Sequence, residues 1–345
     1  MSERSSSSPL RQADRAVTVA DVAERARVST AAVSFYFSDR AEHLKRVGSE
    51  ARERIRAAVE ELGYVPNKTA RHLRRQRSER LCIILPKLGI PYGDKIVQDL
   101  GRVAVEGGLL PIVSTASTRL ELEKVLAEVE AGLADGVVAD VEYLTVDEVN
   151  DVFLNVTRDC LIIHATARSE QFSVLNNGLT AALEVAFDDL VAKGHRNFAY
   201  IENSWSGENP RLATLMDRVR RADGAIRMMT MVGASERSSA AVCARAIASL
   251  DDRPTAVLVD SDYTAVTVIA EFARMEIRVP QDIAVLGCGN AEEGEFSNPS
   301  LSTIGPEWLS LDDAGRYLVE SLVRNEKRPS RQFHTSWRYL PRESA

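Results

Sequence analysis

The sequence predicts an α/β protein in which an all-α, helix-turn-helix segment precedes a core of two doubly wound parallel-sheet subdomains. Three observations predict this. Residues 17–66 contain short helical patterns with capping residues at their starts. From Leu81 onward, short apolar runs alternate with helical patterns, which is typical of parallel sheets covered by helices. The charge also changes sign: residues 1–80 contain 17 Lys and Arg against 11 Asp and Glu, and the remainder contains 26 against 39.

The first two helices are short and are joined by a tight turn. Thr18 is placed to cap the first helix, and Asp21, three residues later, can return the bond as in a capping box. Ser29 can cap the second helix. Apolar residues recur on one face of each helix, namely Val19, Val22, Ala23 and Ala26 in the first and Ala32, Val33 and Tyr36 in the second. A helix held by a short partner in this way can lie in the major groove of DNA.

A third helix follows, for which Ser49 is the expected cap and Gly63 the expected end. Its apolar stripe consists of Ile55, Ala58, Val59 and Leu62. Residues 67–80 then form a short cationic segment, predicted as a hinge that folds against DNA with basic groups on phosphates and Leu73 in the minor groove. The alternative for its basic residues is a solvated linker.

The rest of the chain predicts two sets of alternating strands and helices in tandem. The expected strands are 81–85, 109–113, 136–139, 161–163, 172–175, 198–201, 226–229, 256–259 and 283–287. The expected helices are 94–106, 119–133, 179–193, one from about 211, 240–250 and 263–275. Two such sets predict two similar subdomains, with a ligand crevice at the carboxyl ends of their strands.

The motifs of the helical segment identify a family. Residues 17–34 have the pattern V-T-x-x-D-V-A-x-x-A-x-V-S-x-x-x-V-S, and residues 52–73 have R-x-R-I-x-x-A-x-x-E-L-G-Y-x-P-N-x-x-A-R-x-L. This ordered set resembles the headpiece of the lactose/galactose-repressor (LacI/GalR) family. The resemblance implies contacts with double-stranded DNA from Thr18, Val19, Ser29, Thr30, Ala31, Ser34, Phe35, Asn67, Ala70, Arg71, Leu73 and Arg74.

Two departures from the family pattern stand in the same segment. Arg27 occupies a position where the family usually has Gly, and the join at about residues 39–47 is longer than the family's. Residues 34–44 are also similar to the end of the recognition helix in the tetracycline-repressor family, and Phe35 stands where the LacI/GalR family often has a polar base-contacting residue. The resemblance therefore implies DNA binding but no particular operator sequence.

The core resembles the family too, through residues 190–196, 279–287 and 299–304. It is thus expected to be similar to periplasmic sugar-binding proteins, with the chain crossing between subdomains three times. The implied organisation is a disordered tail at 1–16, a headpiece at 17–66, a hinge at 67–80 and a core at 81–345. One subdomain comprises about 81–177 plus 305–330, and the other about 178–304 plus 331–341.

The resemblance also implies an effector site. Its expected residues are Lys87, Tyr92, Arg211, Asp262, Asn290 and Phe296. Plain structural roles remain open: a surface ion pair for Arg211, a helix cap for Asp262, and core packing for the two aromatics. Lys87 and the turn at 287–290 depart from the family, so the effector is expected to be anionic, a non-sugar or absent.

Composition narrows the function further. The polar N-terminus has no signal peptide, and no apolar run is long enough to span a membrane, so a cytoplasmic location is expected. The four cysteines are scattered without metal-ligand spacing. Catalytic motifs such as a phosphate-binding loop or a nucleophile elbow are absent, so neither enzyme activity nor a cofactor is expected.

These observations predict a DNA-binding transcription regulator. As the resemblance implies, a homodimer would bind a pseudo-palindromic operator, and a small-molecule effector between the subdomains would modulate its affinity. The chain ends at Ala345, without the tetramerisation helix of some family members, which favours a dimer. Two alternatives remain open: a regulator without an effector, and a solute-binding protein in which the headpiece is incidental.

Overall fold

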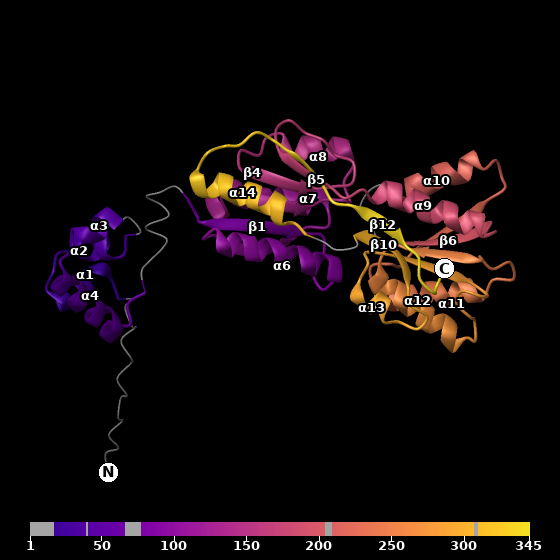
Figure 1. The fold of residues 1–345 in the computed structure, drawn as a ribbon, viewed down its shortest axis with the longest axis horizontal. Coiled ribbons are helices and arrows are strands. Elements are labelled where there is room, and N and C mark those ends of the chain that lie inside the picture. Colours follow the sequence, from indigo (N-terminus) through magenta and orange to yellow (C-terminus); the bar gives the residue numbers. More distant parts are fainter. Residues whose placement is uncertain (1–16, 39–40, 66–76, 204–208, 307–309) are drawn as a thin grey trace, which may run out of the picture. The chain divides into compact units, whose positions relative to one another are not determined.

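The computed structural model describes residues 17–38, 41–65, 77–203, 209–306 and 310–345. The chain divides into two compact units, residues 1–76 and 77–345 (Figure 1). The predicted tail at 1–16 and the hinge residues 67–76 lie outside the described residues.

The first unit is a small helical domain, as predicted. Its helices are α1 (Val19–Ala26), α2 (Thr30–Tyr36), α3 (Ala41–Lys45) and α4 (Ser49–Leu62). The predicted capping box forms, because the Thr18 hydroxyl accepts the Asp21 amide and the Asp21 carboxylate accepts the Thr18 amide. Ser29 caps α2 by accepting the Ala32 amide at 3.1 Å. The domain core consists of Val22, Ala23, Ala26, Val33, Val47, Ile55, Ala58 and Tyr64, all buried.

The long join after α2 contains a short helix, α3, that the sequence did not predict. The side chain of Arg52 donates to the carbonyls of Leu44 and Val47 and so ties the end of this helix to α4. The cap predicted at Ser49 is wrong. Gly48 is the N-cap residue, without a side-chain hydrogen bond, because Val47 is buried in the core and Ser49 already belongs to the helix. Gly63 ends α4 with a φ of 62°, as predicted.

The second unit begins with a six-stranded parallel sheet in the order β11-β5-β4-β3-β1-β2. Its strands are β1 (Arg80–Leu85), β2 (Leu110–Thr115), β3 (Gly136–Asp140), β4 (Asp159–Ile163), β5 (Ser173–Asn176) and β11 (Gln332–His334). Helices α6 (Pro91–Glu106) and α14 (Asp312–Arg324) cover one face. The other face is covered by α7 (Arg119–Glu128), the π-helical turn η1 (Val129–Leu133) and α8 (Val146–Phe153).

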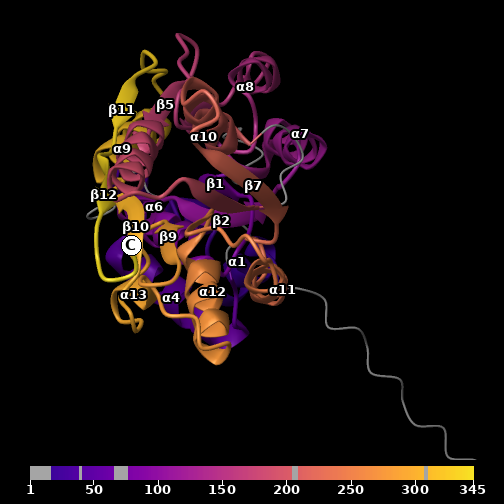
Figure 2. The ribbon, with the colours of Figure 1, turned by 90° about the vertical axis from the view of Figure 1, so that its right-hand side faces the viewer.

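A second six-stranded sheet has the order β12-β10-β9-β8-β6-β7, and only β12 is antiparallel to its neighbour. The strands are β6 (Asn197–Glu202), β7 (Arg227–Val232), β8 (Ala256–Val259), β9 (Ala284–Cys288), β10 (Ser302–Pro306) and β12 (Trp337–Leu340). Helices α9 (Leu179–Ala192) and α10 (Pro210–Arg221) cover one face; α11 (Arg237–Ala248) and α12 (Asp262–Arg274) cover the other (Figure 2). The short helix α13 (Glu292–Glu295) follows β9.

The chain crosses between the two sheets three times, as predicted, but two predicted boundaries move. Residues 305 and 306 belong to the second sheet, since β10 continues through Pro306. Strand β11 joins the first sheet beside β5, so the last crossing follows His334 and not residue 330. The predicted hinge is also too long at its end, because Ser78 and its neighbours are bonded to the core.

Candidate functional site

The predicted DNA-contacting face of α2 is largely exposed. Thr30, Ala31 and Ser34 all point to solvent on this helix. Thr18 and Ser29 are exposed at the starts of α1 and α2, where their hydroxyls accept backbone amides as caps. Small side chains of this kind can contact a thymine methyl group or form one hydrogen bond with a base edge.

Phe35, which the resemblance also places at the DNA, is less exposed than these three residues. Its ring is half-buried, with its centroid 5.0 Å from that of His43 and 5.7 Å from the guanidinium carbon of Arg46. The additional helix α3 thus covers Phe35. Val19 is also half-buried and packs against the domain core. Asn67, Ala70, Arg71, Leu73 and Arg74 lie outside the described residues.

The turn between α1 and α2 explains the departure at Arg27. This residue has φ 55° and ψ 50°, the left-handed conformation in which a β-carbon is unfavourable and glycine is the usual residue. Its amide donates to Glu24, and the Val28 amide donates to Ala23. The backbone geometry of the turn therefore forms without glycine.

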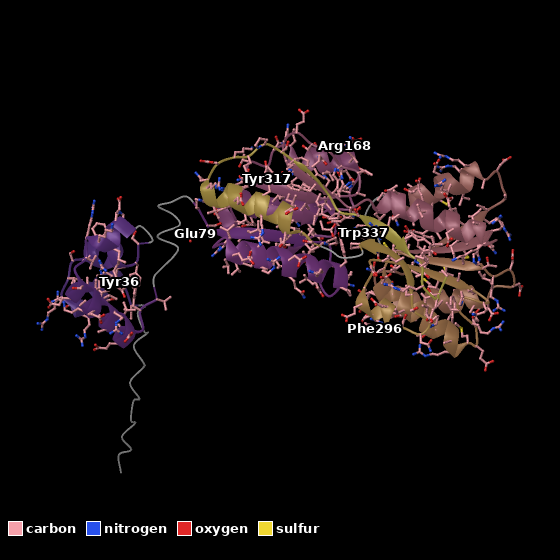
Figure 3. All side chains as sticks on the ribbon, in the orientation of Figure 1. Tyr36, Glu79, Arg168, Phe296, Tyr317 and Trp337 are labelled. Atoms are coloured by element: carbon pink, nitrogen blue, oxygen red, sulfur yellow. The ribbon has the colours of Figure 1, made fainter. Side chains whose placement is uncertain are left out.

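The second unit contains a cavity of about 420 Å³ at the carboxyl ends of the strands in both sheets. It is lined by Pro86, Lys87, Ile90, Tyr92, Gly93, Ser117, Asp140, Glu142, Tyr143, Asn177, Asn203, Arg211, Ser235, Glu236, Asp260, Ser261, Cys288, Gly289 and Trp337. Trp337, at the start of β12, lies where the two subdomains meet (Figure 3). The cavity is therefore the crevice that the strand pattern predicts.

Three of the six predicted effector residues line this cavity: Lys87, Tyr92 and Arg211. The Lys87 ammonium reaches from the first subdomain to the Glu236 carboxylate and to the Ser235 carbonyl, at 2.9 Å, in the second. Arg211 Nη1 donates to the Asp260 carbonyl at 2.9 Å and lies 3.2 Å from its carboxylate. Both cations are therefore paired with carboxylates of the protein.

The other three predicted effector residues do not line the cavity. The Asp262 carboxylate accepts the Thr303 hydroxyl and the Ala291 amide, both at 2.7 Å, and so joins α12 to β10 and the loop after β9. The Asn290 side chain donates to the Pro306 carbonyl and accepts from Arg342. Phe296 is 77% exposed and lies away from Trp337 (Figure 3).

Asp262 is not a helix cap either, since Ser261 is the N-cap residue of α12. The acidic residue at this strand end that faces the cavity is Asp260, two positions earlier. Its carboxylate accepts the Tyr200 hydroxyl, the Asn203 amide and the Asn209 side chain, which positions it beside Arg211. The sequence pattern therefore located the turn at which the cavity lies, and Asp260, not the predicted Asp262, lines the cavity in this structure.

Two acidic residues at and just after the end of β3 were not predicted from the sequence. Asp140 and Glu142 line the cavity and are 7% and 5% exposed. Burial, followed by repulsion from Glu142, raises the pKa of Asp140 to about 7. The sequence contains a signal for them: Asp140 directly follows the apolar run at 136–139 and Glu142 comes two residues later, and parallel strands place such residues at the ligand-binding edge of a sheet.

Two other features were sought in the described residues: a membrane-spanning helix and a metal-binding cluster. Over the described ranges, no helix has the length and apolar character needed to cross a bilayer. In the same part of the chain, no cluster of three or more His, Cys, Asp or Glu side chains could hold a metal ion.

An exposed helix-turn-helix unit and a cleft between two mainly parallel sheets define the class of bacterial transcription regulators with a periplasmic-binding-protein-like core. Two family models match the chain: bacterial regulatory proteins of the lacI family over residues 18–67, and the periplasmic binding protein-like domain over residues 187–345. The chain therefore combines a lacI-family helix-turn-helix domain with a periplasmic binding protein-like domain, which is the domain composition of a LacI/GalR-family regulator.

Named relatives agree with this assignment. The repressor PurR of Klebsiella pneumoniae subsp. pneumoniae is 25% identical over 341 residues, which is 95% of this chain and 96% of that protein. The repressor CytR of Escherichia coli K12 is 25% identical over 297 residues, or 84% and 85% of the two chains.

Solved structures show the same fold. The lac repressor dimer bound to operator and the anti-inducer ONPF aligns with a TM-score of 0.74 at 23% identity, covering 96% of this chain and 99% of that one. A LacI-family regulator from Silicibacter pomeroyi aligns with a TM-score of 0.80 at 18% identity, covering 95% and 99%.

Proposed function

We propose that this chain is a cytoplasmic, sequence-specific DNA-binding repressor that acts as a homodimer and responds to a small molecule in its core cavity. The observation that supports it most strongly is the exposed face of α2 on a capped helical unit. Thr30, Ala31 and Ser34 would contact base edges in the major groove, and two such helices in a dimer would bind a pseudo-palindrome. The proposal includes no catalytic activity.

The start of the core supports a physical link between the cavity and the DNA-binding unit. The Asp135 carboxylate, just before β3, accepts the amides of Ser78 and Glu79 at 2.7 and 2.9 Å. Strands β1 and β3 run side by side from this point to the cavity, where they lead to Lys87 and Asp140. Because β1 and β3 are hydrogen-bonded neighbours, a ligand that shifts their ends at the cleft would also act on Ser78 and Glu79 at their other ends.

The size of this response is limited by the ligand. A ligand shifts an equilibrium between open and closed clefts only by its difference in affinity for the two states. The Lys87–Glu236 pair spans the cleft and stabilises the described closure. A ligand that changes this closure would therefore change operator affinity.

Two alternatives receive less support. A regulator without an effector would be expected to have a filled crevice, but the cavity measures about 420 Å³. A solute-binding protein with an incidental headpiece would not need the capped α1–α2 unit that matches the lacI family model.

The test is selection of bound fragments from random duplex DNA by the full chain, followed by sedimentation of the protein. The expected result is enrichment of a palindrome with a short central spacer by a protein that sediments as a dimer at micromolar concentration. A monomer, or no enrichment at low salt, would contradict the proposal.

A further inference from the structure

The cavity contains two buried acidic side chains that form no ion pair in the described part of the chain, and Arg211, which acts on both through space, is itself paired with Asp260. Asp140 and Glu142 are more than nine-tenths buried, and neither is within ion-pair distance of a Lys or Arg in the described part of the chain. Asn177 donates to one oxygen of Glu142 at 2.8 Å. The second oxygen of each carboxylate has no donor among the described residues, and both side chains line the cavity.

The cations in the lining are already engaged. Lys87 is paired with Glu236, and Arg211 with Asp260. Over the described lining, four acidic side chains therefore face two cations, which gives a net charge of −2 when all four are ionised. The anionic effector suggested by Lys87 in the sequence does not fit this balance, since a second anion would add to the unpaired charge.

Two further polar atoms independently point to a missing ligand. The Tyr143 hydroxyl and the Trp337 indole nitrogen have no hydrogen-bond partner among the residues that the structure describes, and their side chains are 3% and 7% exposed. Both residues line the cavity. Buried polar groups are normally satisfied, and the indole nitrogen can only donate, so a bound molecule should offer it an acceptor.

The remaining wall is aromatic and comes from both subdomains. Tyr92, on α6, meets Trp337, on β12, edge to face with ring centroids 5.3 Å apart. A flat or apolar ligand body would be covered by these rings, whose faces also attract cations. The cavity thus combines an acidic end, an unpaired donor and an aromatic wall.

We propose that the effector is a compact organic cation: an amine or amidinium group held by Asp140 and Glu142, joined to a planar or apolar body with an acceptor for the Trp337 indole. This inference rests on the proposed role of the cavity as the effector site. A neutral ligand could fill the space, but it would offer no ion-pair partner to Asp140 or Glu142. A cation supplies that charge and donors to the free oxygens.

The experiment compares matched pairs of probes that differ in charge and little else: benzamidine with benzamide, tyramine with tyrosol, and glucosamine with glucose. Binding to the full chain is measured by thermal shift at millimolar concentration and then by calorimetry. The variants are Asp140→Asn and Glu142→Gln. The matched control is Asp147→Asn, which removes an exposed carboxylate on α8 outside the cavity.

The expected result is that at least one charged probe binds about tenfold or more tighter than its neutral partner, equivalent to about 1.4 kcal/mol. That preference should disappear in Asp140→Asn and Glu142→Gln and persist in Asp147→Asn. The proposal is overturned if neutral partners bind as tightly, if the preference survives both cavity variants, or if no charged probe binds. Stabilisation by Ca²⁺ or Mg²⁺ alone would also overturn it.

Operator binding by the same preparations separates this inference from the proposed function. If the duplex is bound and only neutral molecules stabilise the core, the ligand class is wrong and the repressor proposal stands. If the duplex is not bound, the repressor proposal fails, while the charge preference of the cavity is still decided by the probe pairs.

Discussion

Replacing Asp140 by Asn should stabilise the second unit, and the effect should grow with pH. The carboxyl group is buried, and its pKa is raised from 3.8 to about 7. The folded protein therefore retains a proton at pH values where the unfolded chain has lost it. Asn has the same shape and can still accept the Glu142 amide, but it has no charge to bury.

The magnitude follows from the two pKa values. Below the pKa that Asp140 has in the unfolded chain, Asp140 is protonated in both states and has no effect on the free energy of unfolding. The free energy of unfolding then falls as pH rises towards the pKa of Asp140 in the folded protein. Above that pKa, the full cost of burying the charge applies. A shift of about three units corresponds to about 4 kcal/mol, an upper limit because the cavity opens to solvent. In a unit of this size, each kcal/mol should move Tm by about 2–4 °C.

Thermal unfolding of the full chain and of Asp140→Asn, at about pH 4.5 and about pH 8.5, measures this effect. Tm should be higher in the variant at the alkaline pH, and the difference should shrink at the acidic pH. Asp147→Asn should leave Tm nearly unchanged at both. The groups that face Asp140 are Glu142, Tyr143, Tyr92 and Arg211. Destabilisation at alkaline pH, or an equal effect at both pH values, would refute the reasoning.

Three other substitutions test separate parts of the structure. Ile55→Ala removes a fully buried side chain from the first unit and should cost it about 2–5 kcal/mol, so duplex binding falls while the thermal transition of the core is unchanged. Asp135→Ala removes the acceptor for the Ser78 and Glu79 amides, so proteolysis near residue 78 should increase and operator affinity should fall. Lys87→Met breaks the exposed ion pair with Glu236 across the cleft. It should change the free energy of unfolding by less than about 1 kcal/mol and yet alter the response to ligand in a duplex-binding titration.

The helical unit was predictable because its signals are local. The capping box at Thr18 and Asp21, the Ser29 cap and the Gly63 end each depend on residues within three or four positions, and all three form. Helix α3 was not predictable in this way. It is five residues long, and its attachment depends on Arg52, seven residues beyond its end.

The strands of the core were predictable because a strand buried on both faces is a continuous apolar run. The cavity residues were only partly predictable. Asp260 faces the cleft and Asp262 does not, because of the backbone conformation between the end of β8 and the start of α12. The apolar periodicity of the sequence does not determine that conformation. The pairing of Lys87 with Glu236 joins residues far apart in the chain, and Trp337 reaches the cavity only through the third crossing.

The central claim is that the exposed face of α2 binds DNA, and an anisotropy titration of the selected duplex tests it most directly. The proteins compared are the full chain, Thr30→Asp on the exposed face of α2, and Ala57→Asp on the exposed face of α4. Thr30→Asp should weaken binding of the duplex at least about tenfold, because the new carboxylate would face phosphates and base acceptors. Ala57→Asp, the control, should change the affinity for the duplex by no more than about twofold. Equal affinity of Thr30→Asp and the unmodified chain, or equal loss in both variants, would contradict the claim.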